Sequence, residues 1–405
     1  MRRAYFLLVF ALVFALVSSS AAPAYAQPYW KKKIGRIVAG KRIGISLRDN
    51  GAFLYRHRDR IKRTPASNQK LLMTMALFER LGADATFETS VLTSGEQIAG
   101  IITGDVYLRG RGDPSMTGGG SFGRALPFQP TALGVLARSI ARTTDRIQGS
   151  VVGSTGYFRH DWFAPGWSST FPTYYVPLAT SLSFEGNTYS GRHIKDPEFR
   201  AAKALTRRLE NLGVAVSGRP RADRMPGNLT TIATTRSVPL AEMVRHMNRS
   251  SSNFFAEMFG KRLGAETYGA PGTIAKGAQA IERYAGRRGI NLTAHDSSGL
   301  SYSNRVAPRS LARLLGQVEA NEPFYEILRD GLPSGGQGTL EDRLHGVNVR
   351  AKTGSLNGIS ALSGWIYLKR TGSWAEFSIL SSGMSYTRAK NVEDRIVRVI
   401  EDLAR

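Results

Sequence analysis

One segment near the start of the chain, residues 63–82 (RTPASNQKLLMTMALFERLG), limits what the rest can fold into. After a turn-like beginning it becomes a helical run with apolar residues on almost every side, closed by Gly82 as a C-terminal cap. A helix that is apolar all round must be buried. The chain therefore needs a sizeable core, which its 405 residues can supply in two or three domains.

The first residues, MRRAYFLLVFALVFALVSSSAAPAYAQ, combine two arginines, an apolar run and the small-x-small sequence Ala24-Tyr25-Ala26. This pattern predicts a signal peptide over residues 1–26 and export to the periplasm or extracellular cell wall, where the mature protein is soluble or peripheral. A membrane anchor is the weaker alternative, because the unbroken apolar run is shorter than the roughly 20 residues of a bilayer span. The chain contains no cysteine, which excludes disulfides and thiolate catalysis.

The chain is strongly basic, with 55 Lys and Arg against 31 Asp and Glu, a formal net charge of +24. Such a charge favours anionic partners, and for an exported protein these are acidic cell-wall polymers or the membrane surface. The alternative is that the charge mainly serves solubility. No basic stripe is interleaved with aromatic residues, so we expect no nucleic-acid partner.

The order of predicted elements indicates a mixed α/β fold with an insertion. Two strands, 42–47 and 51–57, joined by an Asn-Gly turn, precede the helix, and strands with a final helix close the chain. Between them, short strand-like runs alternate with glycine-rich loops and two helical runs. We therefore expect one domain from residues 27–85 and 230–405, interrupted by an inserted α+β domain over residues 86–229.

Ser67 and Lys70 lie three residues apart where the helix begins, so their side chains share one face. A serine hydroxyl attacks a carbonyl only if a base takes its proton, and lysine is such a base when burial or a nearby cation lowers its pKa. The apolar neighbours supply that burial. The alternative is a polar first turn on a buried helix, because S-x-x-K alone is a weak pattern.

Two further patterns suit the same chemistry. Ser251-Ser252-Asn253 forms S-x-N at the head of a predicted helix, and Lys352-Thr353-Gly354 forms K-T-G on a strand-like segment. Singly, the first is equally typical of a helix N-cap and the second of a charged strand end. The order S-x-x-K, S-x-N, K-T-G on helix, helix and strand is far more specific and predicts serine acyl transfer.

With these motifs, the segments LRGRGDPSM, DSSGLSYSN and LPSGGQGTLEDRL resemble the penicillin-binding proteins. The resemblance is closest to the low-molecular-mass, class C type D-Ala-D-Ala carboxypeptidase/D-Ala-D-Ala endopeptidase family. It implies a penicillin-binding-protein/β-lactamase-like transpeptidase domain, an antiparallel sheet flanked by helices and split by the inserted domain. It also implies peptidoglycan stem peptides ending in D-Ala-D-Ala as substrates, β-lactams as inhibitors, and no cofactor. The six histidines are scattered and form no H-E-x-x-H pattern, so we expect no metal site.

The same resemblance implies the catalytic roles. Ser67 attacks the carbonyl between the two D-alanines with Lys70 as general base, and Ser251 relays the proton to the leaving amine. Asn253 holds Lys70 and the substrate backbone. A cation at Lys352 also helps to keep Lys70 neutral.

Substrate-binding roles follow from the resemblance too. Lys352 and Thr353 bind the terminal carboxylate, Gly354 lets the substrate lie close to the strand, and the backbone N–H groups of Ser67 and Ser355 form the oxyanion hole. The Asp113 loop, the Asp296–Ser301 stretch and the Gly338–Leu340 turn are interpreted as structural or wall-contacting rather than catalytic.

Two other functions are also compatible with these motifs. A serine β-lactamase or esterase would use the same serine and lysine, but no motif for a deacylating carboxylate is found. A non-catalytic peptidoglycan-binding protein would need the carboxylate site but not the nucleophile and base.

Overall fold

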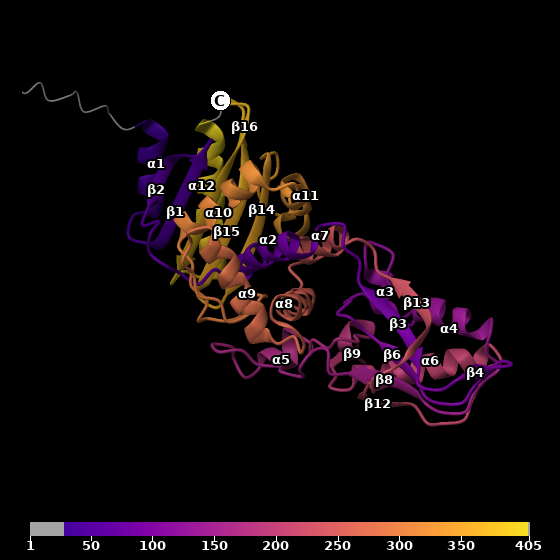
Figure 1. Cartoon of the computed structure of the whole chain (residues 1–405). Coiled ribbons are helices and arrows are strands. Elements are labelled where there is room, and N and C mark those ends of the chain that lie inside the picture. The colour runs from indigo at the N-terminus through magenta and orange to yellow at the C-terminus, as the bar shows by residue number, and fades with distance from the viewer. Residues whose placement is uncertain (1–27, 404–405) are drawn as a thin grey trace, which may run out of the picture.

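The computed structural model describes residues 28–403, which form a larger part, built on a sheet with strands from both ends of the chain, and a smaller, elongated part (Figure 1). The predicted signal peptide, residues 1–26, lies outside the described residues. Between residues 28 and 403, no helix combines the length and apolarity needed to cross a membrane.

Strands from both ends of the chain form the larger antiparallel sheet, in the order β14-β15-β16-β1-β2. These strands are β1 (Arg42–Asp49), β2 (Ala52–His57), β14 (Val349–Leu356), β15 (Ile359–Leu368) and β16 (Ser373–Ser382). β1 pairs with β16, which brings Arg42 opposite Ser382. The turn between β1 and β2 has positive φ at both Asn50 and Gly51, as a two-residue hairpin requires.

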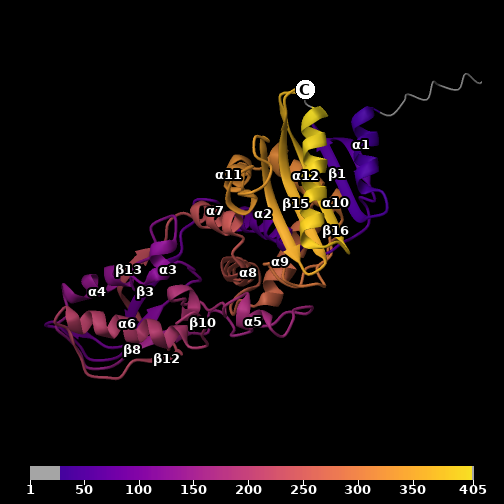
Figure 2. The ribbon, with the colours of Figure 1, turned by 180° about the vertical axis from the view of Figure 1, so that it is seen from behind.

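Helices cover both faces of this sheet (Figure 2). α1 (Tyr29–Val38) and α12 (Tyr386–Leu403) pack on one face, and α10 (Pro308–Asn321) and α2 (Gln69–Leu81) lie on the other. Side chains along β15 alternate between the two faces of the sheet. Leu362 and Ile366 pack into the core under α12, and Ala361 and Trp365 pack into the core on the opposite face. The predicted fold class, a mixed α/β fold with an antiparallel sheet flanked by helices, is confirmed.

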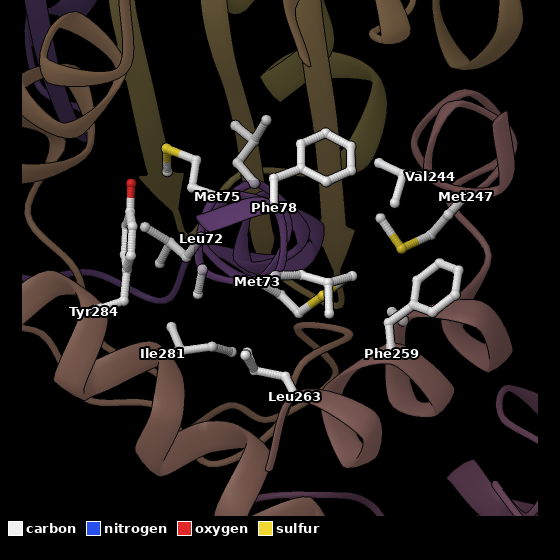
Figure 3. Close-up of a cluster of buried hydrophobic side chains, with 14 of the residues drawn as sticks. Leu72, Met73, Met75, Phe78, Val244, Met247, Phe259, Leu263, Ile281 and Tyr284 are labelled. Atoms are coloured by element: carbon white, nitrogen blue, oxygen red, sulfur yellow. The ribbon is translucent and has the colours of Figure 1, made fainter. Parts of the chain in front are cut away.

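The helix α2 is buried on all sides, as its composition predicts (Figure 3). The sheet lies on one side of it, and α7 (Leu240–Ser250), α8 (Asn253–Tyr268) and α9 (Ile274–Arg287) surround the rest. Its partners include Val244 and Met247 of α7, Phe259 and Leu263 of α8, and Ile281 and Tyr284 of α9. α11 (Tyr325–Gly331) packs beside α7.

The smaller part has its own sheets and its own core. One sheet has the order β12-β8-β6-β3-β13, with β3 (Glu88–Thr93), β6 (Val106–Arg109), β8 (Val151–Thr155), β12 (Arg221–Arg224) and β13 (Thr230–Arg236). The other has the order β11-β7-β5-β4, with β4 (Gln97–Ile98), β5 (Ile101–Ile102), β7 (Arg146–Ile147) and β11 (Ala215–Val216). Among its helices are α3 (Ser121–Ala125), α4 (Leu133–Ala141) and α6 (Pro197–Asn211).

The boundary predicted at residue 229 cuts this sheet in the wrong place. β13 begins at Thr230 and pairs antiparallel with β3, with Thr230 opposite Thr93. Hydrogen bonding therefore joins β13 to the smaller part, and the chain returns to the larger part only after Arg236.

The segment between β8 and α6 runs back to the larger part. It contains α5 (Phe171–Tyr174), β9 (Thr188–Tyr189) and β10 (Arg192–His193), and α5 lies near α8 and α9 in Figure 1. The backbone N–H of Arg159 donates to the carbonyl of Gly272, 2.9 Å away, just before α9. The sequence segment expected to be inserted therefore also contacts the helices around α2.

Candidate active site

Ser67 lies on a short 3₁₀ turn, η1 (Ala66–Asn68), that leads directly into α2. Ala66 has a positive φ of 47°, so the backbone turns sharply just before the serine. Gly299 packs against this turn: a Cβ there would lie 1.9 Å from the Ala66 carbonyl oxygen, and its φ is +87°. Tight packing on both sides therefore fixes where the Ser67 side chain emerges.

Lys70 is fully buried in the first turn of α2, and its Nζ has three neighbours at hydrogen-bond distance. These are Ser67 Oγ at 3.1 Å, Asn253 Oδ1 at 2.8 Å and the carbonyl oxygen of Ser298 at 2.6 Å. Two of the three can only accept hydrogen bonds. A neutral amine has two N–H groups for those acceptors, and its lone pair then faces the Ser67 hydroxyl.

Burial lowers the pKa of Lys70 to about 7, although the carboxylates of Asp296 and Glu257 act in the opposite direction. The contribution expected from the cation at Lys352 is smaller than that of burial, the main cause of the lowered Lys70 pKa. Repulsion is instead evident at Lys352 itself, where burial and the nearby Lys70 and Lys390 lower the pKa. A neutral Lys70 near physiological pH is thus chiefly a consequence of its desolvation.

The Asp296–Ser301 stretch holds the Ser298 carbonyl against Lys70. Glu257 Oε1 accepts hydrogen bonds from the backbone N–H groups of Ser297 (3.1 Å) and Ser298 (2.8 Å). Asp296 accepts from the N–H groups of Gly299 and Ser301, at 3.0 and 2.7 Å. The interpretation of this stretch as structural or wall-contacting was incomplete, because one of its carbonyls touches the lysine.

The S-x-N residues span the junction of two helices. Ser251 ends α7 in a left-handed conformation with φ 57°, Ser252 caps α8 by accepting from the Phe255 N–H at 3.3 Å, and Asn253 begins α8. Only the last two residues are therefore at the predicted helix head. The Asn253 Nδ2 donates to the Tyr175 carbonyl at 3.0 Å, which leaves Oδ1 facing Lys70.

Lys352 and Ser251 form a second polar pair beside the first. Lys352 is fully buried on β14 and donates to Ser251 Oγ and to the Thr353 carbonyl, each at 2.9 Å. Thr353 Oγ1 donates to Thr339 Oγ1 at 2.7 Å, on the turn η3 (Gly338–Leu340). The turn, interpreted from the sequence as structural or wall-contacting, therefore also contacts a residue of the K-T-G motif.

β14 is the edge strand of the sheet and lies against η1. The Ala351 N–H donates outward to Pro333 O at 2.9 Å, whereas the Asn348 carbonyl accepts from Tyr367 N within the sheet. Backbone groups alternate along a strand, so the Ser355 N–H also points off the edge. A Cβ on Gly354 would lie 3.0 Å from Ser67 N, so a second reason for glycine here is the approach of the Ser67 turn.

A comparison with known protein families shows which family this chain belongs to. The sequence pattern of the D-Ala-D-Ala carboxypeptidase 3 (S13) family matches residues 36–192 and 178–403. The chain belongs to this S13 family. Membership confirms the prediction of a serine-type carboxypeptidase, a hydrolase. Within residues 28–403 no group of three or more His, Asp or Glu side chains is placed to hold a metal ion, so we assign no metal ligands.

One curated relative and two solved structures match this S13 enzyme over most of their own length. Carboxypeptidase DacB of Mycolicibacterium smegmatis is 30% identical over 395 residues, which cover 92% of this chain and 81% of the relative. The crystal structure of penicillin binding protein 4 from Haemophilus influenzae has a TM-score of 0.75 at 20% identity, covering 91% of this chain and 98% of that one. The penicillin G-acylated predatory endopeptidase Bd3459 of Bdellovibrio bacteriovorus has a TM-score of 0.53 at 17% identity, with coverages of 89% and 91%.

Proposed function

We propose that this S13 enzyme hydrolyses the bond between the two terminal D-alanines of peptidoglycan stem peptides through an acyl-enzyme on Ser67. The observation that carries this proposal is the surroundings of Lys70. Two carbonyl-type acceptors, Asn253 Oδ1 and Ser298 O, take the N–H groups of its neutral form. The lone pair is then left for the Ser67 hydroxyl.

In the acylation step, Ser67 Oγ bonds to the substrate carbonyl carbon while Lys70 Nζ takes the hydroxyl proton. The backbone N–H groups of Ser67 and Ser355 stabilise the oxyanion, each by roughly 3 kcal/mol. The carbon–nitrogen bond then breaks, and the amine leaves with a proton delivered through Ser251. Lys352 donates to that hydroxyl, which orients it for the relay.

Deacylation repeats the chemistry with water. Lys70 takes a proton from the water as its oxygen bonds to the acyl carbon, and Ser67 Oγ leaves with a proton. The net reaction adds one water across the peptide bond. It releases D-alanine from an uncross-linked stem, which is carboxypeptidase action, or a second stem peptide from a cross-link, which is endopeptidase action.

The second polar pair supplies a carboxylate site. A buried lysine ammonium is unfavourable on its own, and burial lowers the pKa of Lys352. An incoming carboxylate would favour the charged form and would find Thr353 beside it. This pairing selects substrates that carry a free carboxylate on the residue directly after the scissile bond.

β-Lactams offer this site the same groups, an amide carbonyl beside a carboxylate. When Ser67 opens the ring, the amine stays attached and blocks the path of the deacylating water. We therefore propose that penicillins form a long-lived acyl-enzyme here.

We further propose that residues 1–26 direct export and are removed, so that the enzyme acts in the periplasm or cell wall. Residues 27–85 and 237–405 would form the peptidase domain, with residues 86–236 as the inserted domain. The net charge, +24 for the whole chain and about +22 once Arg2 and Arg3 leave with the signal peptide, supports contact with anionic wall polymers or the membrane surface.

The deciding experiment is intact mass spectrometry of the mature protein after brief exposure to benzylpenicillin, beside the Ser67→Ala variant. We expect one penicilloyl adduct, absent in the variant and decaying over hours. A transient adduct with rapid antibiotic turnover would indicate a β-lactamase instead. No adduct at any dose would leave a non-catalytic wall-binding protein.

A further inference from the structure

A pocket of about 560 Å³ adjoins the Lys352 side of the site. It lies between α7 of the larger part and the loop that follows α3 of the smaller part, and Figure 1 shows both helices. The residues that matter for its chemistry are Phe128, Glu242, Arg245, His246, Arg249 and Thr339. The roles proposed so far for the catalytic site do not use this pocket.

Helix α7 supplies one wall of the pocket and leads to the catalytic groups. Glu242, Arg245 and Arg249 are spaced so that they share one face, and the opposite face packs into the core (Figure 3). The helix ends at Ser250, and Ser251 follows directly. Arg249 is thus the pocket arginine nearest in sequence to the proton relay, and Glu242 lies about 10 Å further along the axis.

The end of the pocket near the site is cationic. Among residues 28–403, no carboxylate lies within salt-bridge distance of Arg245 or Arg249, and both are exposed. Partial desolvation and the like charges of Arg245 and Arg350 lower the pKa of Arg249, which shows how closely the arginines gather. Burial also lowers the pKa of His246, so the imidazole is neutral near pH 7.

Thr339 connects this pocket with the reaction. It lines the pocket and accepts the hydrogen bond of Thr353, which belongs to the proposed carboxylate site. Ser251, where the leaving amine receives its proton, adjoins Ser250 on the pocket wall. A leaving group larger than one D-alanine would therefore continue past Thr353 into this space.

We propose that the pocket binds carboxylates of the leaving half of a cross-linked peptidoglycan dimer, and so directs the enzyme towards endopeptidase action. A single D-alanine carries one carboxylate, which Lys352 and Thr353 already take. The second stem peptide released from a cross-link carries further carboxylates, for which Arg245 and Arg249 provide donors. This proposal rests on the proposed function.

The test compares two substrates of the same enzyme, a cross-linked muropeptide dimer and an uncross-linked pentapeptide. We expect the double variant Arg245→Ala/Arg249→Ala to lower the dimer-to-pentapeptide ratio of kcat/KM about tenfold, chiefly through a higher KM for the dimer. The ratio does not depend on how much of each preparation is folded. The matched control is Arg395→Ala/Arg398→Ala, two exposed arginines of α12 on the other face of the sheet, which should keep the wild-type ratio.

Penicillin labelling of the same preparations separates the two proposals. An unchanged ratio in the Arg245/Arg249 variant, with Ser67-dependent acylation intact, would overturn the pocket assignment alone. So would a wild-type enzyme that is acylated and releases D-alanine but does not cleave the dimer. A wild-type enzyme without any penicilloyl adduct would overturn the proposed function and the pocket assignment with it.

Discussion

Two lysines of this enzyme, Lys70 beside the Ser67 turn and Lys261 where the inserted segment meets α8, are buried equally deeply. The Nζ of Lys261 donates to the carbonyls of Arg159, Asp161 and Ala179, each at 2.9 Å, and pairs with the Asp161 carboxylate at 2.8 Å. The Nζ of Lys70 meets only two carbonyl-type acceptors, and its third neighbour is a hydroxyl.

The difference lies in what each set of neighbours allows. Burial lowers the pKa of both lysines, and at Lys261 the Asp161 carboxylate opposes that effect. Three acceptors use all three N–H groups of an ammonium, so Lys261 acts as a cationic clamp between α8 and residues 159–179. At Lys70 one position is left for a hydroxyl that can give up its proton. The chemistry of the neighbours, more than the depth of burial, thus separates a base from a clamp.

The largest expected effect is on catalysis by Lys70→Met. Without the base, we expect the rate of acylation by benzylpenicillin to fall by about 10³-fold, measured by the mass of the penicilloyl adduct over time. The loss of stability should be smaller than in a variant of Lys261, because only two carbonyl-type acceptors lose their donor and no paired carboxylate is left behind. Acylation at the wild-type rate would show that Lys70 is another clamp.

The same substitution at the other lysine, Lys261→Met, should lower the free energy of unfolding more than it lowers catalysis. It leaves the Asp161 carboxylate and three carbonyls without their donor, so we expect a loss of about 3–5 kcal/mol in the free energy of unfolding, measured with urea. Acylation of the folded fraction should fall far less than in Lys70→Met. A large catalytic loss at full stability would contradict the clamp.

The pH dependence tests the neighbours of Lys70. Only its neutral form accepts a proton, so acylation should rise as the pH rises through about 7, the pKa of Lys70. In Asn253→Asp a carboxylate replaces an amide beside the amine and raises that pKa. We expect the rise to move to higher pH and the rate at pH 7 to fall about tenfold. An unmoved midpoint would mean that another group controls the profile.

The smallest effect is expected for the reverse exchange, Asp161→Asn. The amide keeps the shape of the side chain and removes only the charge, so we expect about 1 kcal/mol less stability in the same urea titration. The midpoint of the acylation profile should stay at the wild-type pH, which makes this variant the control for Asn253→Asp. A moved midpoint would show that the two lysines are coupled.

Much of the site could be predicted from spacing within short segments. Ser67 and Lys70 were expected to share a helix face, and their side-chain atoms lie 3.1 Å apart. The K-T-G residues were expected on a strand, and β14 contains all three. These predictions succeed because three-residue spacing and strand periodicity fix local geometry before any tertiary contact forms.

Other parts of the site carry no local pattern. The carbonyls of Ser298 and Tyr175 reach Lys70 and Asn253 from distant segments, and any residue type can present a carbonyl. β13 was misassigned because its sequence, TTIATTR, is polar and mostly exposed, with little of the alternation of a half-buried strand. Pairing with β3 decides where it belongs.

The sequence by itself determined the buried helix, the hairpin, the three motifs and the family, because each depends on residue types at fixed local spacing. Burial does not distinguish Lys70 from Lys261, since apolar residues lie close to both in the sequence and both are enclosed in the fold. Only the tertiary structure decided that difference. A lysine's proton affinity and role depend on which acceptors the fold brings to its nitrogen, and at both sites most of those acceptors come from other parts of the chain.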